Sequence, residues 1–441
     1  MSHRDLLPQI ISQWEAQQAP YRLYRNYYDG KHAFPFASRK FAATYRWILA
    51  RARENLMPAV VAAFTDVIRI SSWTDTKAIE AADLNGVTRL AGLIHRETFR
   101  EGDAYTITWP DPAGEARAVF QPAEKIVPHI DPTNPDVLDW AARVWIEDSG
   151  YGRVNIYTPD ACERYVSRLK ITDAGRSLRR SFTDQAIAWG PFADNLGGPV
   201  LTHVMGATPV VWWKRDADDQ SGKGRSILEQ AIPAQDELNY HVVTGLISSE
   251  RIALPIRYAL ADIPPEGSLE FDPTIESILG LTAKQAGQFA EPDAGKLIAL
   301  QTAAEQKIAR IVGVPPYVFS QQSADVPSGE ALRILNARRT SAVLAFQADA
   351  TPCWRGQMGL LGYDDVEPEW ADPTPHDDTE RLTNGTLAKS LGLPVEEWLR
   401  EAGYDPDAVD AGGERLADRV RAESSRSAVA QAQAFLDGQS V

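Results

Sequence analysis

The stretch SILEQAIPAQDELNYHVVTGLISSER, residues 226 to 251, decides how the rest of this chain is organised. Its apolar residues recur at three-, four- and seven-residue steps, which places them on one face of an α-helix. Pro233 has no amide hydrogen and clashes with the preceding turn, so the helix either kinks there or begins anew with Pro233 near its first position. The face consists of Leu228, Ala231, Ile232, Leu238, Val242 and Leu246.

A second helix with the same pattern is predicted over residues 295 to 312. Glycine just past a helix and proline after it are typical of a helix end, and Gly313 and Pro315 provide them. A third helix should begin at Ser328, whose hydroxyl can cap it, and should run through Leu332 and Phe346. The apolar face of the second helix consists of Leu297, Leu300, Ala304, Ile308 and Ile311.

Outside these helices, short alternating or β-branched runs predict an antiparallel sheet region with helices on it. The fold class is therefore α+β. The predicted strands are Tyr105 to Trp109, Ala116 to Phe120, Lys125 to His129, Trp140 to Ile146, Arg153 to Thr158 and Pro209 to Trp213.

Several of these stretches together resemble a known family. The run IARIVGVPPY, residues 308 to 317, followed by PSGEAL, residues 327 to 332, resembles the portal proteins of tailed bacteriophages, in the short, SPP1-like branch. Similar stretches occur in the family's order along about nine tenths of the chain. They are residues 24 to 30, Asn55, Val60 and Val61, residues 206 to 211, 224 to 226 and 235 to 239, and residues 365 to 383.

The resemblance implies a portal fold with the family's division of the chain. Its parts are an N-terminal wing of mixed helix and antiparallel sheet (1–225), a first stem helix (226–251), a small α/β clip (252–293), a second stem helix (294–313), a tunnel loop (314–327), a long kinked wing helix and strand (328–372) and a helical crown (373–441).

The resemblance also implies the function. The chain would be a virion protein, assembled in the host cytoplasm, that forms a ring of twelve copies at one capsid vertex. Double-stranded DNA would be packaged and ejected through the ring without sequence specificity. The implied partners are the large terminase, the major capsid and scaffolding proteins of the procapsid and the head-tail adaptor, with no cofactor and no enzymatic activity of the chain itself.

Three sets of residues are candidates for this function. The tunnel loop facing DNA would present Ser320, Gln321, Gln322, Ser323, Ala324 and Asp325, which are small and polar with one acid. Lys296, Lys307 and Arg310 either line the channel or form salt bridges between subunits, and the sequence does not choose between these roles. The apolar stripes supply candidates for the subunit interface: Leu297, Leu300, Ile308, Leu238 and Val242.

Composition agrees with this interpretation without deciding it. The 441 residues carry a net charge of −15, whereas proteins that grip DNA phosphates usually present a basic surface. An acidic wall would let DNA slide. The two cysteines show no CxxC spacing, which favours a reducing compartment. The N-terminus lacks an export signal, and glycine and proline interrupt the longest uncharged stretch, 195–213, so no membrane segment is expected.

Other chemistries are less well supported. Residues 221 to 226, SGKGRS, lack the spacing of a phosphate-binding loop and are interpreted as a flexible lead-in to a helix. Tyr24, Tyr27 and Tyr28 could stack on bases, but packing is the more common role. The acidic groups at Asp216, Asp218 and Asp219 and at Asp372, His376, Asp377 and Asp378 have ligand types for a hard cation, yet such runs are usually solvated turns.

The alternative function is a soluble acidic hydrolase or glycan-active enzyme. Abundant Trp and Asp would then supply stacking surfaces and a pair of carboxylates. No spacing in the sequence selects such a pair, and there is no HExxH or Gly-x-Ser-x-Gly motif.

Overall fold

The computed structural model of the chain is an α+β fold. It describes residues 3–111, 113–131, 134–173, 178–179, 181–182, 187–195, 197–218, 221–253, 257–260, 285–288, 293–319, 329–374, 386–401, 404, 406 and 415–421. The chain divides into two compact units. Unit 1 comprises residues 1–321 and 341–373, and unit 2 comprises residues 322–340 and 374–441.

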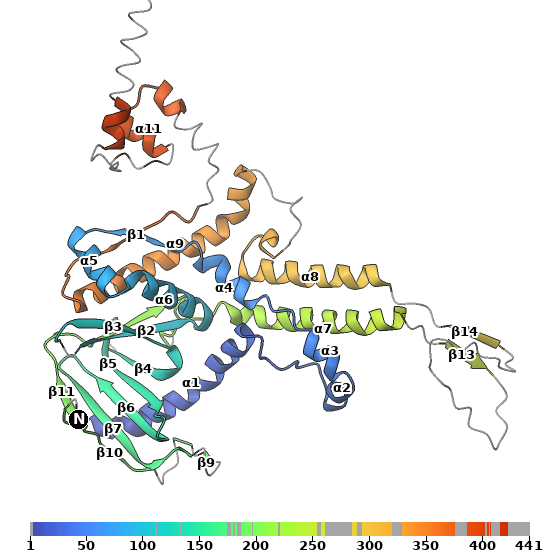
Figure 1. Cartoon of the computed structure of the whole chain (residues 1–441), viewed down its shortest axis with the longest axis horizontal. Helices are drawn as coiled ribbons and strands as arrows, with labels where there is room; N and C mark the ends of the chain where they lie inside the picture. Colours follow the sequence, from blue (N-terminus) through green and yellow to red (C-terminus); the bar gives the residue numbers. More distant parts are fainter. Residues whose placement is uncertain are drawn as a thin grey trace, which may run out of the picture. The chain divides into compact units, whose positions relative to one another are not determined.

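The larger sheet of unit 1 is antiparallel, in the order β10-β7-β6-β5-β4, with β11 also paired to β7. Helix α1 lies along it (Figure 1), and Leu7, Ile10 and Ile11 of this region pack on Val144 and Val154 of the sheet. The strands are β4 (Ile126–Asp131), β5 (Asn134–Ile146), β6 (Tyr151–Tyr157), β7 (Ala161–Lys170), β10 (Trp189–Pro191) and β11 (Val200–Thr202). The short strands β8 (Thr172–Asp173) and β9 (Leu178–Arg179) pair with each other.

A second sheet, in the order β12-β2-β3, is covered by helices that form the main core. The core includes Phe64 of α4, Phe99 of α6, Trp213 of β12, Leu228 of α7 and Trp354 of α9, all almost fully buried. The strands are β2 (Asp103–Pro110), β3 (Ala116–Gln121) and β12 (Val210–Lys214), and the helices are α4 (Met57–Thr65), α5 (Thr76–Leu84), α6 (Val87–Glu101), α7 (Leu228–Ala253), α8 (Ala294–Val312) and α9 (Gly329–Leu360).

Smaller elements complete the unit. Strands β1 (Ile70–Trp73) and β15 (Pro368–Trp370) pair antiparallel although they are far apart in sequence. The remaining elements are η1 (His3–Leu6), α1 (Leu7–Tyr28), α2 (Arg39–Thr44), α3 (Arg46–Arg51), η2 (Ala123–Lys125), β13 (Arg257–Leu260), β14 (Gln285–Gln288) and η4 (Pro316–Val318). No helix among the described residues is long and apolar enough to cross a membrane.

Unit 2 contains short helices. Its described elements include α11 (Val395–Glu401), a helical turn over 386–390 and a helical segment described as far as Arg421. Ala388, Leu399 and Ala417 are buried, and Arg421 forms an ion pair with Glu396. These contacts hold the small helical cluster together.

Most predicted elements are confirmed, and some features differ. All six predicted strands are present, as β2 to β6 and β12, but β1, β7, β10 and β11 were not predicted. The sequence of β7, ACERYVSRLK, carries charged residues that interrupt an apolar alternation. The strand nevertheless buries Arg164, whose guanidinium donates to Asp194. Helix α7 is continuous through Pro233, so of the two alternatives the one in which a new helix begins at this residue is wrong. The proposed cap Ser328 and the tunnel loop residues 320–325 lie outside the described residues, as does most of the proposed clip.

Candidate functional site

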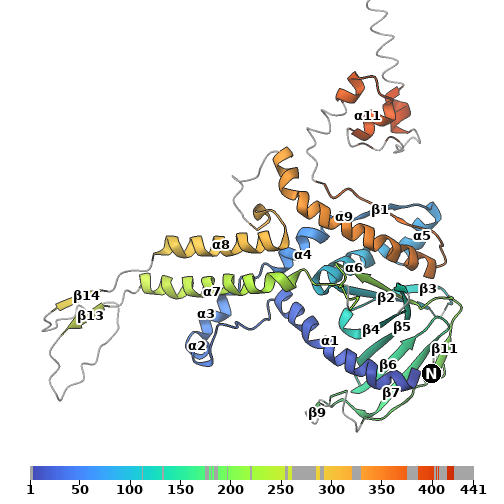
Figure 2. The ribbon, with the colours of Figure 1, turned by 180° about the vertical axis from the view of Figure 1, so that it is seen from behind.

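The candidate site is the pair of long helices α7 and α8. Figures 1 and 2 show them side by side, extending away from the sheets of unit 1. They are antiparallel, because Glu237 contacts Lys307 while His241, one turn further along α7, contacts Gln301, further back along α8. Asp293 caps the start of α8, since its carboxylate accepts from two backbone amides, and Gly313 follows the last residue of the helix in the left-handed conformation.

The inner half of the pair is anchored by a buried polar motif on α7. Both Gln235 and Asn239 are fully buried. The Gln235 side chain accepts from the Leu56 amide (3.0 Å) and donates to the Glu54 carbonyl (2.6 Å). Asn239 contacts the His32 ring at 3.0 Å. The polar residues of the stretch 235–239 therefore hold residues 32–56 against α7.

The tyrosines near the N-terminus have structural roles. Tyr27 is buried, its hydroxyl donates to Asp236 (2.8 Å), and its ring stacks on His32. Burial raises the pKa of Asp236. Tyr28 lies under the Arg100 guanidinium. The packing interpretation of these side chains is thus supported over base stacking.

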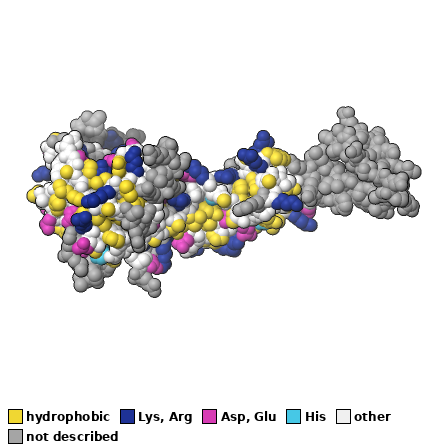
Figure 3. Space-filling model, turned by 90° about the horizontal axis from the view of Figure 1, so that it is seen from below, with side chains coloured by type: hydrophobic (Ala, Val, Ile, Leu, Met, Phe, Trp, Pro, Cys, Tyr) yellow, Lys and Arg dark blue, Asp and Glu magenta, His cyan; other side chains and the backbone are white. Residues whose placement is uncertain are grey.

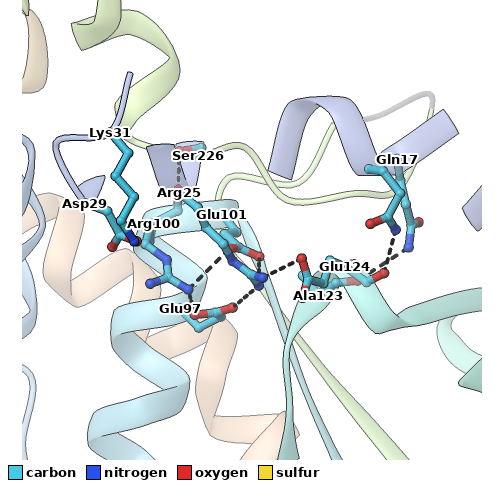
Figure 4. A network of polar contacts seen from close by, with 11 residues as sticks. Gln17, Arg25, Asp29, Lys31, Glu97, Arg100, Glu101, Ala123, Glu124 and Ser226 are labelled. Carbon is cyan, nitrogen blue, oxygen red and sulfur yellow. Dashed lines mark hydrogen bonds and ion pairs between the residues drawn. The ribbon is translucent and has the colours of Figure 1, made fainter. Parts of the chain in front are cut away.

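A buried ionic network fixes the point where α7 begins (Figure 4). The Arg25 guanidinium pairs with Glu101 (Nε to Oε1, 2.5 Å), with Glu97 (3.2 Å) and with Glu124. Arg100 pairs with Glu97 and Glu101. Burial, together with the neighbouring Glu97, raises the pKa of the Glu101 carboxyl. The network joins α1, α6 and η2.

Ser226 connects this network to α7. Its hydroxyl donates to the Arg100 carbonyl (2.5 Å) and accepts from the Leu228 amide (3.1 Å). The first turn of α7 is therefore tied to the last turn of α6.

The segment 221–226 is ordered by a second buried group, so its interpretation as flexible is wrong. The Asp103 carboxylate is 1 % exposed and accepts from the Gly224 amide (2.8 Å), the Trp212 indole (2.8 Å) and the Tyr21 hydroxyl (2.9 Å). Burial raises the pKa of Asp103, and these three donors reduce the rise without cancelling it. Lys223 donates to Gln17 (3.1 Å).

A cavity of about 460 Å³ lies beside this segment, lined by Tyr21, Tyr24, Trp212, Glu101 and Asp103 among others. Both of its carboxyls are engaged, Glu101 by Arg25 and Asp103 by its three donors. Both carboxyls therefore have structural roles at the start of α7.

Among the proposed cation ligands, Asp218 is used in contacts within the chain. Asp218 accepts from Ser221 and pairs with Arg225 (2.7 Å), and these contacts lower its pKa. Asp219, His376, Asp377 and Asp378 lie outside the described residues. No group of three possible metal-ligating side chains occurs in the part of the chain that the structure describes.

The interface candidates divide into two groups. Leu238 and Ile308 are fully buried inside this chain, so neither offers surface to a second copy. The prediction that these two residues lie in the subunit interface is therefore corrected. Val242 and Leu297 are partly buried, and Leu300 is 46 % exposed. Toward the outer ends, the described part of the chain thus leaves some of these side chains exposed.

Other apolar side chains of α7 and α8 are exposed but were not among the interface candidates, because the helical period alone does not show where coverage by the chain ends. Ile298 is 62 % exposed, Tyr240 49 % and Leu246 38 %. Residues two apart on a helix point in different directions, so Ile298 and Leu300 expose apolar side chains on different sides of α8. We call Tyr240, Leu246, Ile298 and Leu300 the outer apolar surface.

The three channel-lining candidates lie on α8. Lys307 forms an ion pair with Glu237 of α7 (2.5 Å) and lowers the pKa of that carboxyl. Lys296 is exposed and lies 3.5 Å from Asp293. Arg310 is exposed near the end of the helix. Lys307 thus has a partner within its own chain, while the side chain of Lys296 extends into solvent.

Solved structures of gene transfer agent (GTA) particles align with most of this chain. No protein-family model and no curated protein matches the sequence. The matching structures include the neck of the native GTA particle computed with C12 symmetry (14 % identity, TM-score 0.45), the neck of the empty GTA particle computed with C6 symmetry (14 %, 0.48) and the virion of the native GTA particle (13 %, 0.45). Each alignment covers 84 % of this chain and 95 % of the other. Similarity at this level does not establish a shared fold.

Proposed function

We propose that this chain is a portal protein, the head-to-tail connector of a tailed phage or phage-like particle of the SPP1-like branch. Copies of the chain form a ring, twelve in the portal family, at one capsid vertex, and double-stranded DNA passes through its channel. The chain does not hydrolyse ATP itself, because that step belongs to the large terminase that docks on the ring. Scaffolding and major capsid proteins and the head-tail adaptor are the further partners.

The observation that carries the proposal is the outer apolar surface on α7 and α8. The inner half of the helix pair is rigidly anchored by the polar motif 235–239 and by the network around Arg25. The outer half projects with apolar side chains that the described part of the chain leaves uncovered. A closed ring needs each subunit to present two different complementary faces, and a helix pair that exposes apolar side chains on more than one side suits that requirement.

Within this proposal the candidate residues keep distinct roles. Val242, Leu297 and Leu300 belong to the subunit interface together with the outer apolar surface. Lys296 and Arg310 are proposed to face the channel, and Lys307 either faces it or joins subunits while paired to Glu237. The loop at residues 320–325, outside the described residues, is proposed to contact the moving DNA without gripping it.

The test is the native mass of the purified chain together with images of the same sample. Twelve copies of 48.6 kDa give a ring of about 580 kDa with a central hole, as closed cyclic symmetry requires. A compact particle that stays monomeric with shell and scaffolding proteins present would contradict the proposal.

A matched pair of variants tests the surface itself. Leu300→Asp places a charge where the interface is proposed, and burying an unpaired carboxylate costs several kcal/mol. Leu23→Asp, on α1, is the control, because Leu23 is exposed to nearly the same extent (45 % against 46 %) in the same kind of element. We expect rings from the Leu23 variant and monomers from the Leu300 variant. Rings from both would remove α8 from the interface.

A further inference from the structure

The segment from residue 30 to residue 53 has a charge opposite to that of the rest of the chain. It contains six of the 45 basic residues and none of the 60 acidic ones. It also carries five large aromatic side chains, Phe34, Phe36, Phe41, Tyr45 and Trp47. A cationic, aromatic segment in an acidic protein is a distinct surface, and neither the helix pair nor the DNA channel described above accounts for it.

The structure attaches this segment to the flank of α7. Ile48, Leu49 and Ala52 are buried and cluster with Val243, while Phe36 meets Tyr240 edge to face. The opposite side of α3 is exposed, since Arg46, Trp47 and Arg51 all point to solvent. Figure 3 shows this side of the molecule, with dark blue Lys and Arg side chains standing around yellow hydrophobic ones over the helix pair where α2 and α3 lie.

The exposed cations of α2 and α3 that the structure describes have no acidic partner among the described residues, whereas Lys31, earlier in the segment, pairs with Asp29 (2.9 Å). Arg53 donates to the Gly30 carbonyl and lies over Phe34, so it is used to close the segment on itself. Lys40, Arg46 and Arg51 make no such side-chain contact with the residues that the structure describes. Between the two arginines stands Trp47, which is 52 % exposed. We call Lys40, Arg46, Trp47 and Arg51 the arm face.

We propose that the arm face docks on the acidic surface of a second copy of this chain. The inference rests on the proposed ring, in which each subunit must present a face to its neighbour that differs from the face it receives. All 60 acidic residues lie outside the segment 30–53, so the remaining surface of a neighbouring copy is acidic on average. Charge complementarity of this kind steers association and fixes register.

The exposed tryptophan favours a protein partner over duplex DNA. A duplex backbone offers phosphates to cations but no apolar pocket for an indole, whereas Trp and Arg are the residues most enriched at the centres of protein interfaces. The contact therefore combines a steering component from the cations with an apolar anchor from Trp47.

The experiment measures ring formation as a function of salt, by native mass, for three variants and the wild type. Arg46→Glu with Arg51→Glu reverses the charge of the arm face. Lys77→Glu with Arg89→Glu is the control, because it changes the net charge by the same amount at exposed positions of α5 and α6. Trp47→Ala removes the anchor without changing charge, and the partial exposure of Trp47 leaves the fold little affected.

We expect the double reversal in the arm face to weaken ring formation about tenfold or more at about 0.05 M salt, with the difference shrinking at about 0.5 M as charges are screened. Trp47→Ala should weaken rings at both salt concentrations, and the control should match the wild type.

Two results would overturn the inference while leaving the proposed ring intact. One is that the arm-face reversal forms rings as well as the control does. The other is that rings are unchanged but the wild type binds a short DNA duplex and the reversal does not, which would assign the arm face to DNA. If the wild type forms no rings even with shell and scaffolding proteins, the proposed function itself fails, which is a separate outcome.

Discussion

The close approach of Gly102 and Gly224 gives a sharp test of how α7 is held. Gly102 ends α6 with φ of 91°, and Gly224 lies in the lead-in to α7. A methyl group on Gly224 would overlap the Gly102 carbonyl and would lie 2.9 Å from the Arg215 amide nitrogen. Real methyl groups do not approach backbone so closely, so Gly224→Ala must force the two segments apart.

The cost of that separation can be worked out from the contacts it disturbs. Overpacking a tight site costs about 1–3 kcal/mol. The Gly224 amide also donates to the buried Asp103 carboxylate at 2.8 Å, and a hydrogen bond to a charged group contributes about 1.5–3 kcal/mol. We therefore expect Gly224→Ala to lower the free energy of unfolding by about 3–5 kcal/mol.

The assay is urea denaturation followed by tryptophan fluorescence. The control is Gly356→Ala, since Gly356 lies within α9 with open space where the methyl group would go. That change should leave stability equal or up to about 1 kcal/mol higher, because alanine favours helix. A Gly224→Ala protein within about 0.5 kcal/mol of the wild type would refute the claim that the segment is tightly packed.

Two further predictions concern buried ionisable groups in unit 1. Arg25→Met leaves Glu97, Glu101 and Glu124 without the guanidinium that they share. This change should lower the free energy of unfolding by about 3–5 kcal/mol in the same assay, and a loss below about 1 kcal/mol would show that the network contributes little. Burial lowers the pKa of His95 from 6.5 to about 3, so the unfolded chain takes up a proton first as pH falls through this window, and folding stability is lost. Between pH 6.5 and pH 5 the wild type should therefore lose about 1.6 kcal/mol more than His95→Gln, and equal losses would contradict the assignment of His95 as a neutral buried ring.

The folded chain also shows why some residues with chemical potential serve packing. Sequence spacing alone allowed SGKGRS at 221–226 to be compared with a phosphate-binding loop. In the structure, position 224 requires glycine because the Gly102 carbonyl lies against it. Position 226 requires a hydroxyl because that of Ser226 links α6 to α7. Both requirements come from a helix that ends more than a hundred residues earlier, so no local pattern could show them.

The sequence by itself determined the elements whose signals are local. The apolar period and the glycine and proline after position 312 located α8, and alternation between turn residues located β2 to β6, because backbone geometry converts these patterns directly into helix and strand. It also determined the charge contrast between residues 30–53 and the rest of the chain.

Only the tertiary structure decided which apolar residues of the stripes are covered. Leu238 and Leu300 follow the same helical pattern, yet Leu238 is fully buried and Leu300 is 46 % exposed. The difference arises because residues 32–56 and the helices of the main core surround the inner half of the pair but do not cover Leu300. Coverage depends on contacts between segments far apart in the sequence, and period alone carries no information about them.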